Sequence, residues 1–178
     1  IGRALQMVGK DGAIRVEQST RNEPYIEIVD GMRIPFGLSS PYDMLPSELH
    51  EPYILLTEDE ISTPQEIVSL LQTISIAKEG ILIVAPSIDR ESMAAFAVNA
   101  LRDTLQISAI TASLELLQRM EKAFGGKIVS KKSGMELKEV GMEMLGRAKK
   151  VVVGKEESWI FGGQGEKVCR VAIVGDVE

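Results

Sequence analysis

The sequence predicts an α/β fold, a layered domain with a mixed sheet flanked by helices, and three observations support this class. Short apolar runs of the buried-strand type alternate along the chain with segments whose apolar residues recur at the helical period. Gly, Pro and polar clusters separate these segments. The 178 residues, 44% of them apolar, suit one domain with a substantial core. Alternating strands and helices indicate a sheet that is at least partly parallel.

The first third of the chain predicts short strands separated by turns and one long loop. Alternating residues indicate the strands, and the second should end at Asp30 and Gly31. The loop is punctuated by Pro and Gly, and loops of its length are usually functional or mobile. In order, we expect the end of a helix at 1–7, a turn at 8–12, strands at 13–17 and 25–29, the loop at 34–52 and a strand at 53–56.

Two helices flank a fully apolar strand, residues 81–85, in the middle of the chain. The first is expected at 64–78, where Ser62 or Thr63 can cap it and a proline suits its first turn. The second is expected at 90–102. The core face of the first helix gathers Ile67, Leu70, Ile74 and Ala77.

The last part of the chain continues the alternation, with a Gly pair that ends its helix. Its tail, 167–178, is too short to assign. We expect strands at 106–110, 127–130, 151–153 and 159–161, a helix at 113–124 and a polar segment at 138–147.

Both central helices carry more apolar residues than a core face needs. In the first helix, Val68 and Leu71 lie on a shoulder where the helix should turn towards water. Two interpretations fit: helices sandwiched between two layers, which periodicity alone favours, or a surface that offers spare apolar side chains to a partner. In the second helix the apolar residues are Met93, Ala94, Phe96, Ala97, Val98, Ala100 and Leu101.

Composition excludes several classes of protein. The net charge of −6 and the pI near 5.0 argue against a nucleic-acid surface. The single Cys169 forbids an internal disulfide and permits a reducing compartment. No apolar run reaches the length of a membrane span. The chain starts at Ile1 without a signal-peptide pattern, so we expect it to be a piece of a longer protein.

The residues do not predict an assembled active site. His50, the only histidine, lies in the Pro-rich loop and is expected to face solvent, and one Cys with one His cannot form a structural zinc site. The glycine-rich stretch 162–167 lacks the spacing of a phosphate loop, so a tight turn is expected. The acidic trio 58–60 fits a solvated approach to a helix, and Trp159 fits the core or a sheet surface.

Short motifs spread along the chain occur in a recognisable order. They are Asp30-Gly31-Met32, Gly37-Leu38-Ser39-Ser40-Pro41-Tyr42, Pro52-Tyr53-Ile54-Leu55-Leu56, Ile61-Ser62, Asn99-Ala100-Leu101-Arg102, Gly125-Gly126, Gly134-Met135-Glu136-Leu137 and residues 145–153. In this order they resemble the apical domain of group I (GroEL-type) chaperonins. The resemblance covers nearly the whole chain and implies an apical-domain-like fold. Residues 1–22 would be the end of the intermediate domain and a linker, and 23–178 the apical domain, possibly truncated at its C-terminal end.

The resemblance also implies a function. In such chaperonins the two corresponding helices form a hydrophobic groove that binds non-native polypeptide and the co-chaperonin, within an ATP-driven protein-folding ring. This chain has Leu38 and Asp43 where the family carries aromatic residues, and two loops are shorter. Position by position, the binding residues would be Leu38, Tyr42, Val68, Leu71, Met93, Ala97, Val98, Asn99 and Arg102.

Cofactors and partners follow from the same resemblance. The family's ATP and Mg site lies in an equatorial domain that these residues do not contain, so we expect no catalytic, cofactor or metal residues in this chain and no enzyme activity of its own. The expected partners are unfolded polypeptides and a co-chaperonin, with no nucleic acid and no membrane. The parent would be a homo-oligomeric ring and this chain a monomer, in a bacterial cytoplasm or an organelle matrix or stroma.

One alternative stays open, a small-molecule or nucleotide-binding α/β domain that shares only the architecture. The groove hypothesis predicts that Val68, Leu71, Met93 and Val98 are partly exposed, while Ile67, Leu70, Ile74 and Phe96 are buried. Leu71 lies at the edge of the core stripe. On the groove hypothesis, Leu71→Glu abolishes binding and leaves the fold nearly intact.

Overall fold

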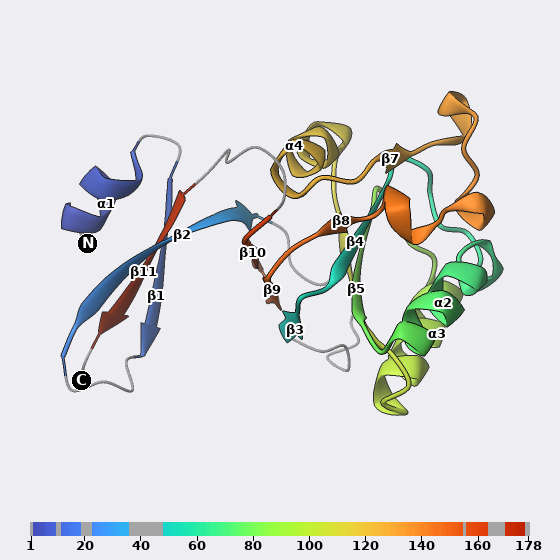
Figure 1. Ribbon diagram of the computed structural model, residues 1–178, viewed down its shortest axis with the longest axis horizontal. Helices are drawn as coiled ribbons and strands as arrows, with labels where there is room; N and C mark the ends of the chain where they lie inside the picture. The colour runs from blue at the N-terminus through green and yellow to red at the C-terminus, as the bar shows by residue number, and fades with distance from the viewer. Residues whose placement is uncertain are drawn as a thin grey trace.

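Two mixed β-sheets flanked by helices make up the computed structural model (Figure 1), which confirms the expected α/β class. The structure describes residues 2–9, 12–18, 23–35, 48–154, 156–163 and 170–176. A smaller lobe holds both ends of the chain, and a larger lobe holds most of the helices (Figure 1). Within the described residues, no helix is long and apolar enough to cross a bilayer.

A six-stranded sheet extends from the smaller lobe into the larger one in the order β1-β11-β2-β10-β9-β3. β11 is parallel to β1, and every other neighbouring pair is antiparallel. α1 packs on the face of this sheet that carries Ala172. The elements are α1 (Gly2–Val8), β1 (Ala13–Gln18), β2 (Tyr25–Ile34), β3 (Glu48–His50), β9 (Lys150–Val153), β10 (Ser158–Phe161) and β11 (Arg170–Asp176).

Three expectations for this sheet were incomplete. The unassigned tail forms β11, which pairs with strands more than 130 residues earlier in the chain. β2 does not end at Gly31 but continues to Ile34, and a side chain at Gly31 would lie 2.7 Å from the carbonyl oxygen of Ile160. The loop expected at 34–52 contains β3, because Leu49 is buried opposite Val151; residues 36–47 lie outside the described part.

The second sheet is the centre of the larger lobe. β5 and β7 run parallel to β4 on its two sides, β6 runs parallel to β5, and β8 pairs antiparallel with the first half of β4. Helices connect these strands as crossovers, which parallel strands require. The strands are β4 (Tyr53–Thr57), β5 (Gly80–Ala85), β6 (Gln106–Thr111), β7 (Ile128–Val129) and β8 (Gly146–Arg147).

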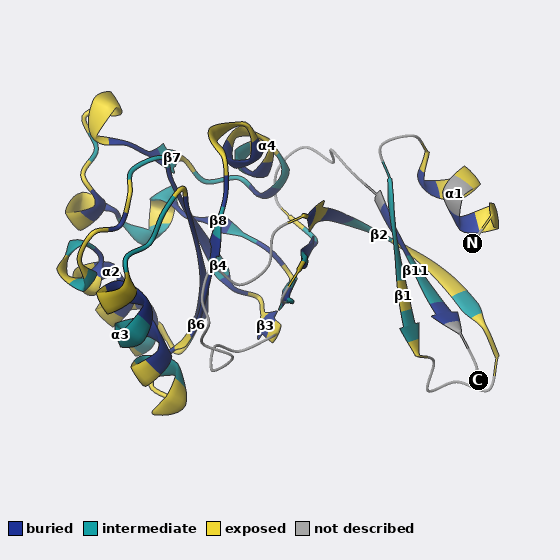
Figure 2. Cartoon of the chain, turned by 180° about the vertical axis from the view of Figure 1, so that it is seen from behind, coloured by how far each residue is buried: buried dark blue, intermediate teal, exposed yellow. Residues whose placement is uncertain are grey.

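Both faces of the second sheet are buried, which explains its uninterrupted apolar runs. Odd-numbered residues such as Leu55 and Ile83 pack against α2 and α3. Even-numbered residues such as Leu56 and Val84 pack against α4 and the inner face of the six-stranded sheet. Figure 2 shows the corresponding pattern on α2 and α3, buried towards the sheet and exposed on the outer side.

The helices follow the expected ranges with one change. The segment expected as a helix at 64–78 begins as a 3-10 turn, and α2 starts after Ile67 leaves helical geometry at φ −123° and ψ 4°. Neither Ser62 nor Thr63 caps α2 through its side chain; the backbone N–H of Ser62 donates to the Glu66 carboxylate instead. The α-helices are α2 (Val68–Ala77), α3 (Arg90–Leu101) and α4 (Leu114–Phe124); the 3-10 turns are Pro64–Glu66, Lys131–Ser133, Leu137–Glu139 and Met142–Met144.

Asp89 caps the start of α3. Its carboxylate accepts hydrogen bonds from the backbone N–H of Ser92 at 2.9 Å and of Glu91 at 3.2 Å. The hydroxyl of Ser92, followed by the N–H of the same residue, favours the charged carboxylate and holds the pKa of Asp89 below its usual range. This end of α3 is therefore fixed by a charged cap that α2 lacks.

Candidate functional site

A groove of about 450 Å³ lies between α2 and the C-terminal end of α3. One bank is α2, and the other is the last turn of α3 with the loop that leads to β6. The α2 bank consists of Val68, Leu71, Gln72, Ser75 and Ile76, and the opposite bank of Asn99, Arg102, Thr104 and Leu105.

The α2 bank supplies most of the apolar surface. Val68 and Ile76 are 43% and 84% exposed, and they belong to one row of residues spaced four apart along the helix. Leu71 and Leu105 are buried and form the floor. A large aliphatic side chain such as Ile76 that is almost fully exposed, next to a floor of leucines, is an apolar surface without an internal partner.

The opposite bank is polar, and most of its polar groups are already bonded within the protein. The Ser75 hydroxyl donates to the backbone carbonyl of Thr104 at 2.8 Å, which ties α2 to the loop after α3. The Thr104 hydroxyl donates to the Asn99 carbonyl at 2.9 Å, and the Asn99 amide donates to the Ala95 carbonyl at 2.8 Å. The Ser75–Thr104 bond joins the two banks, and the other two bonds hold the opposite bank together.

Four of the nine residues predicted from the sequence line this groove: Val68, Leu71, Asn99 and Arg102. Val98 is 45% exposed, as expected, but it does not line the groove. Leu38 and Tyr42 lie outside the described residues.

The expected exposure was wrong for Met93 and Leu71, and Ala97, which was predicted as a binding residue, is buried as well. Met93 and Ala97 are 3% and 4% exposed because they share with Phe96 the stripe of α3 that packs on the sheet, so neither belongs to a groove. Leu71 is only 8% exposed because its side chain also joins the core beneath α2. The four residues that were expected to be buried are buried: Ile67, Leu70, Ile74 and Phe96.

Ile76 and Leu105 are groove residues that the sequence reasoning missed. Ile76 lies eight residues after Val68, about 80° round the helix, at the end of the row that Val68 and Gln72 begin, so the period already contained part of this signal. Leu105 belongs to a loop, and no periodicity could have placed it. Leu101, at 63%, is the most exposed large apolar residue of α3.

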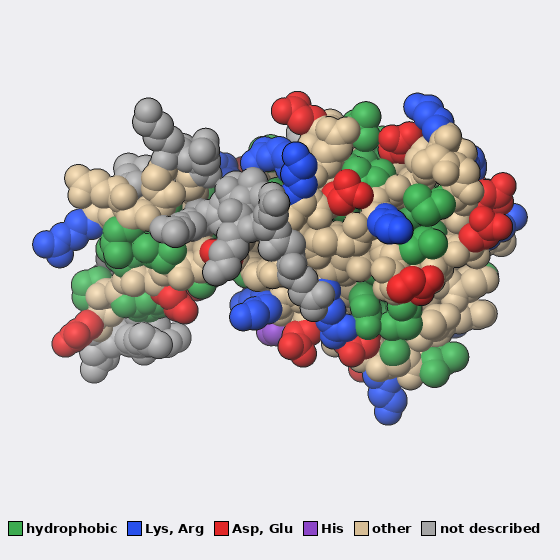
Figure 3. All heavy atoms as spheres, turned by 45° about the horizontal axis from the view of Figure 1, so that its top comes forward, with side chains coloured by type: hydrophobic (Ala, Val, Ile, Leu, Met, Phe, Trp, Pro, Cys, Tyr) green, Lys and Arg blue, Asp and Glu red, His purple; other side chains and the backbone are tan. Residues whose placement is uncertain are grey.

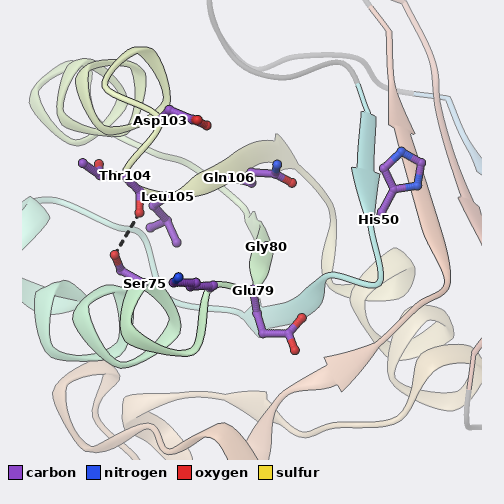
Figure 4. A pocket seen from close by; sticks show the side chains of 9 residues that line it. His50, Ser75, Glu79, Gly80, Asp103, Thr104, Leu105 and Gln106 are labelled. Carbon is purple, nitrogen blue, oxygen red and sulfur yellow. Dashed lines mark hydrogen bonds between the residues drawn. The ribbon is translucent and has the colours of Figure 1, made fainter.

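A second, more polar pocket of about 360 Å³ adjoins the groove (Figure 4). The two share Ser75, Thr104 and Leu105, and the hydrogen bond from Ser75 to Thr104 lies between them. Two loop residues at the ends of the helices, Lys78 and Asp103, adopt positive φ values of 57° and 52°. The rest of the lining is His50, Lys78, Glu79, Gly80, Asp103 and Gln106.

This polar pocket holds no assembled catalytic group. The His50 ring stands across the pocket from the Ser75 hydroxyl (Figure 4), and its Nε2 lies 3.9 Å from a carboxylate oxygen of Glu48. The Ser75 hydroxyl is committed to Thr104. A histidine that neither contacts nor orients a nucleophile does not form a catalytic pair.

The carboxyl ends of the parallel strands, where α/β domains commonly bind ligands, are occupied by internal contacts. The acidic trio 58–60 is part of these contacts rather than a solvated approach to a helix. Glu58 accepts a hydrogen bond from the Ser130 hydroxyl, Asp59 from the Lys131 backbone at 2.6 Å, and Glu60 from the Ser87 hydroxyl at 3.0 Å. Among the described residues, no group of three His, Cys, Asp or Glu side chains could hold a metal ion.

Trp159 has a structural position, as the sequence indicated. It is 5% exposed and stacks on Phe161 with ring centroids 6.4 Å apart. The guanidinium of Arg15 lies 5.9 Å from its centroid. The glycine-rich stretch begins with Gly162 at φ 66°, consistent with a turn, and continues outside the described residues.

No protein-family model matches the chain. Its function is therefore inferred from the groove and from the order of the motifs in its sequence. The groove has an apolar bank on one side and a bank of mostly hydrogen-bonded polar groups on the other.

Proposed function

We propose that the chain is a polypeptide-binding module of the kind found in the apical domain of group I chaperonins, which binds non-native polypeptide through the groove between α2 and α3. The observation that carries the proposal is the pairing of exposed Val68 and Ile76 with a leucine floor in a groove of about 450 Å³. The resemblance carried by the ordered motifs supports the same function independently of this geometry.

Binding in such a groove is largely hydrophobic and tolerant of sequence. Apolar surface removed from water contributes about 25 cal/mol per Å², from which the cost of ordering the peptide is subtracted. On the face drawn in Figure 3, apolar side chains of the larger lobe stand in small groups between charged ones. A local apolar surface of this kind gives weak, reversible capture of exposed apolar segments.

By resemblance, the wider role would belong to a longer protein. By resemblance, the parent would be a homo-oligomeric ring driven by ATP and Mg in another domain, and a co-chaperonin would compete for the same groove. The chain itself would capture polypeptide without hydrolysing nucleotide.

The proposal is tested by an aggregation assay with the purified chain and no nucleotide. We expect the chain to slow the aggregation of an unfolded protein weakly, and Ile76→Gln to reduce the effect, because this change removes exposed apolar surface and keeps a good helix former. Leu114→Gln is the matched control, since Leu114 is 48% exposed on α4, outside the groove.

Two outcomes would contradict the proposal. One is a strict requirement for ATP, or measurable hydrolysis by the purified chain. The other is an equal loss of aggregation suppression in the Ile76 and Leu114 variants, which would mean that any exposed apolar residue binds the unfolded protein equally well.

A further inference from the structure

The groove contains one unpaired positive charge and no negative one. Arg102 follows the last residue of α3 and is exposed, and its guanidinium makes no hydrogen bond or ion pair with any described residue. The other lining residues are apolar or neutral. An arginine at the rim of an apolar surface is therefore available to a ligand.

The acidic side chains of the adjoining polar pocket form no ion pair with Arg102. Glu79 and Asp103 line the adjoining polar pocket rather than the groove. Glu79 is paired with Arg147 at 3.2 Å. Asp103 follows Arg102 in the sequence, yet the two side chains form no ion pair. Figure 4 shows Glu79 and Asp103 at opposite ends of that pocket.

The polar groups around Arg102 leave it as the main free donor of its bank. The Asn99 amide and the Ser75 and Thr104 hydroxyls already donate to backbone carbonyls. A guanidinium presents a planar fork of N–H donors that matches a carboxylate. The groove thus combines apolar contact on α2 with one carboxylate-binding group on the facing bank.

We infer that the groove selects apolar segments that carry a carboxylate beside their apolar side chains, with Arg102 as its partner. The inference rests on the proposed function, because it names which polypeptide segments the same groove prefers. The carboxylate is a Glu or Asp side chain, or the C-terminus of the bound segment.

The experiment uses the whole chain and a set of short fluorescent peptides with identical apolar residues. One position is Glu, Gln or Lys in peptides with an amidated C-terminus, and a fourth peptide has Gln with a free C-terminal carboxylate. Binding is followed by fluorescence anisotropy at low salt and again at about 1 M salt, where the Debye length falls to about 3 Å.

We expect the Glu peptide to bind about threefold more tightly than the Gln peptide at low salt, as for a partly exposed ion pair, and the Lys peptide to bind more weakly. High salt should remove most of the difference. Arg102→Gln should abolish the preference without weakening the Gln peptide. Arg90→Gln is the control, because Arg90 is an exposed arginine at the other end of α3, outside the groove.

Each outcome is decisive. A preference for Glu, or for the free C-terminus, that is lost in Arg102→Gln and kept in Arg90→Gln supports the inference and identifies the source of the carboxylate. Equal binding of the amidated Glu and Gln peptides and of the free-carboxylate peptide, or a preference that survives Arg102→Gln, overturns the inference and leaves the proposed function standing. If no peptide binds, both fail.

Discussion

α2 and α3 cover the same face of one sheet, yet they use their apolar excess differently. α3 places Met93 and Ala97 in the core and leaves Val98 and Leu101 exposed outside the groove. Asn99 and, just after the end of α3, Arg102 line the groove. α2 keeps its core stripe narrower and leaves Val68 and Ile76 exposed along the groove. A broad apolar arc in a helix therefore does not by itself indicate a binding surface. What decides is the direction of the arc relative to the sheet and the neighbouring helix.

The largest effect that separates the two helices is on stability. Met93→Ala should lower the free energy of unfolding by about 2–4 kcal/mol, because it opens a cavity under α3. Val68→Ala should change it by less than about 1 kcal/mol, since that side chain is half exposed. Urea denaturation followed by circular dichroism measures both. Similar losses in the two variants would mean that α2 and α3 do not differ in this way.

Leu71 lies between these two cases and sharpens the comparison. With 8% exposure and core contacts, Leu71→Glu should cost about 2–4 kcal/mol of stability and reduce peptide binding. The sequence had suggested a nearly unchanged fold. Leu71→Met, a volume-conserving change, should keep both properties. If Leu71→Glu lost peptide binding but kept the urea midpoint, Leu71 would act as an exposed groove residue and not as a core residue.

The smallest effect concerns the start of the two helices, where α3 has a charged cap and α2 has no side-chain cap. Because the pKa of Asp89 is lowered in the folded state, its contribution to stability is present above the unfolded pKa of about 3.9 and is lost as pH falls through the folded pKa. Asp89→Asn keeps the cap and removes the titration, so the difference from wild type should shrink in acid. Asp103→Asn is the control. A difference that does not change with pH would show that the Asp89 charge is not responsible.

Much of the fold could be predicted because its signals are local. The composition and the period of apolar residues predict buried strands and amphipathic helices. Ser113 caps α4 at the start of the predicted helix. β11 could not be assigned, because its stability comes from pairing with β1 and β2, far away in the sequence. The extension of β2 past Gly31 likewise depends on β10.

The candidate site could be predicted only in part for a related reason. Period alone identifies rows of residues on a helix, and it placed Val68 on a shoulder outside the core face, where the structure exposes it. It does not say which row faces the sheet, and Met93, which the family resemblance assigned to the groove, packs in the core. Leu105 reaches the groove from a loop and the Ser75–Thr104 bond crosses between elements, so both depend on tertiary structure.

The central claim, that polypeptide binds between α2 and α3, is tested most directly by NMR titration of the isotopically labelled chain with an apolar peptide. We expect amide shift changes at Gln72, Ile76 and Asn99, which line the groove, and little change around Leu114 on α4. Shift changes concentrated on α4, or at the carboxyl ends of the parallel strands around Glu58 and Ser130, would contradict the claim and favour a different site.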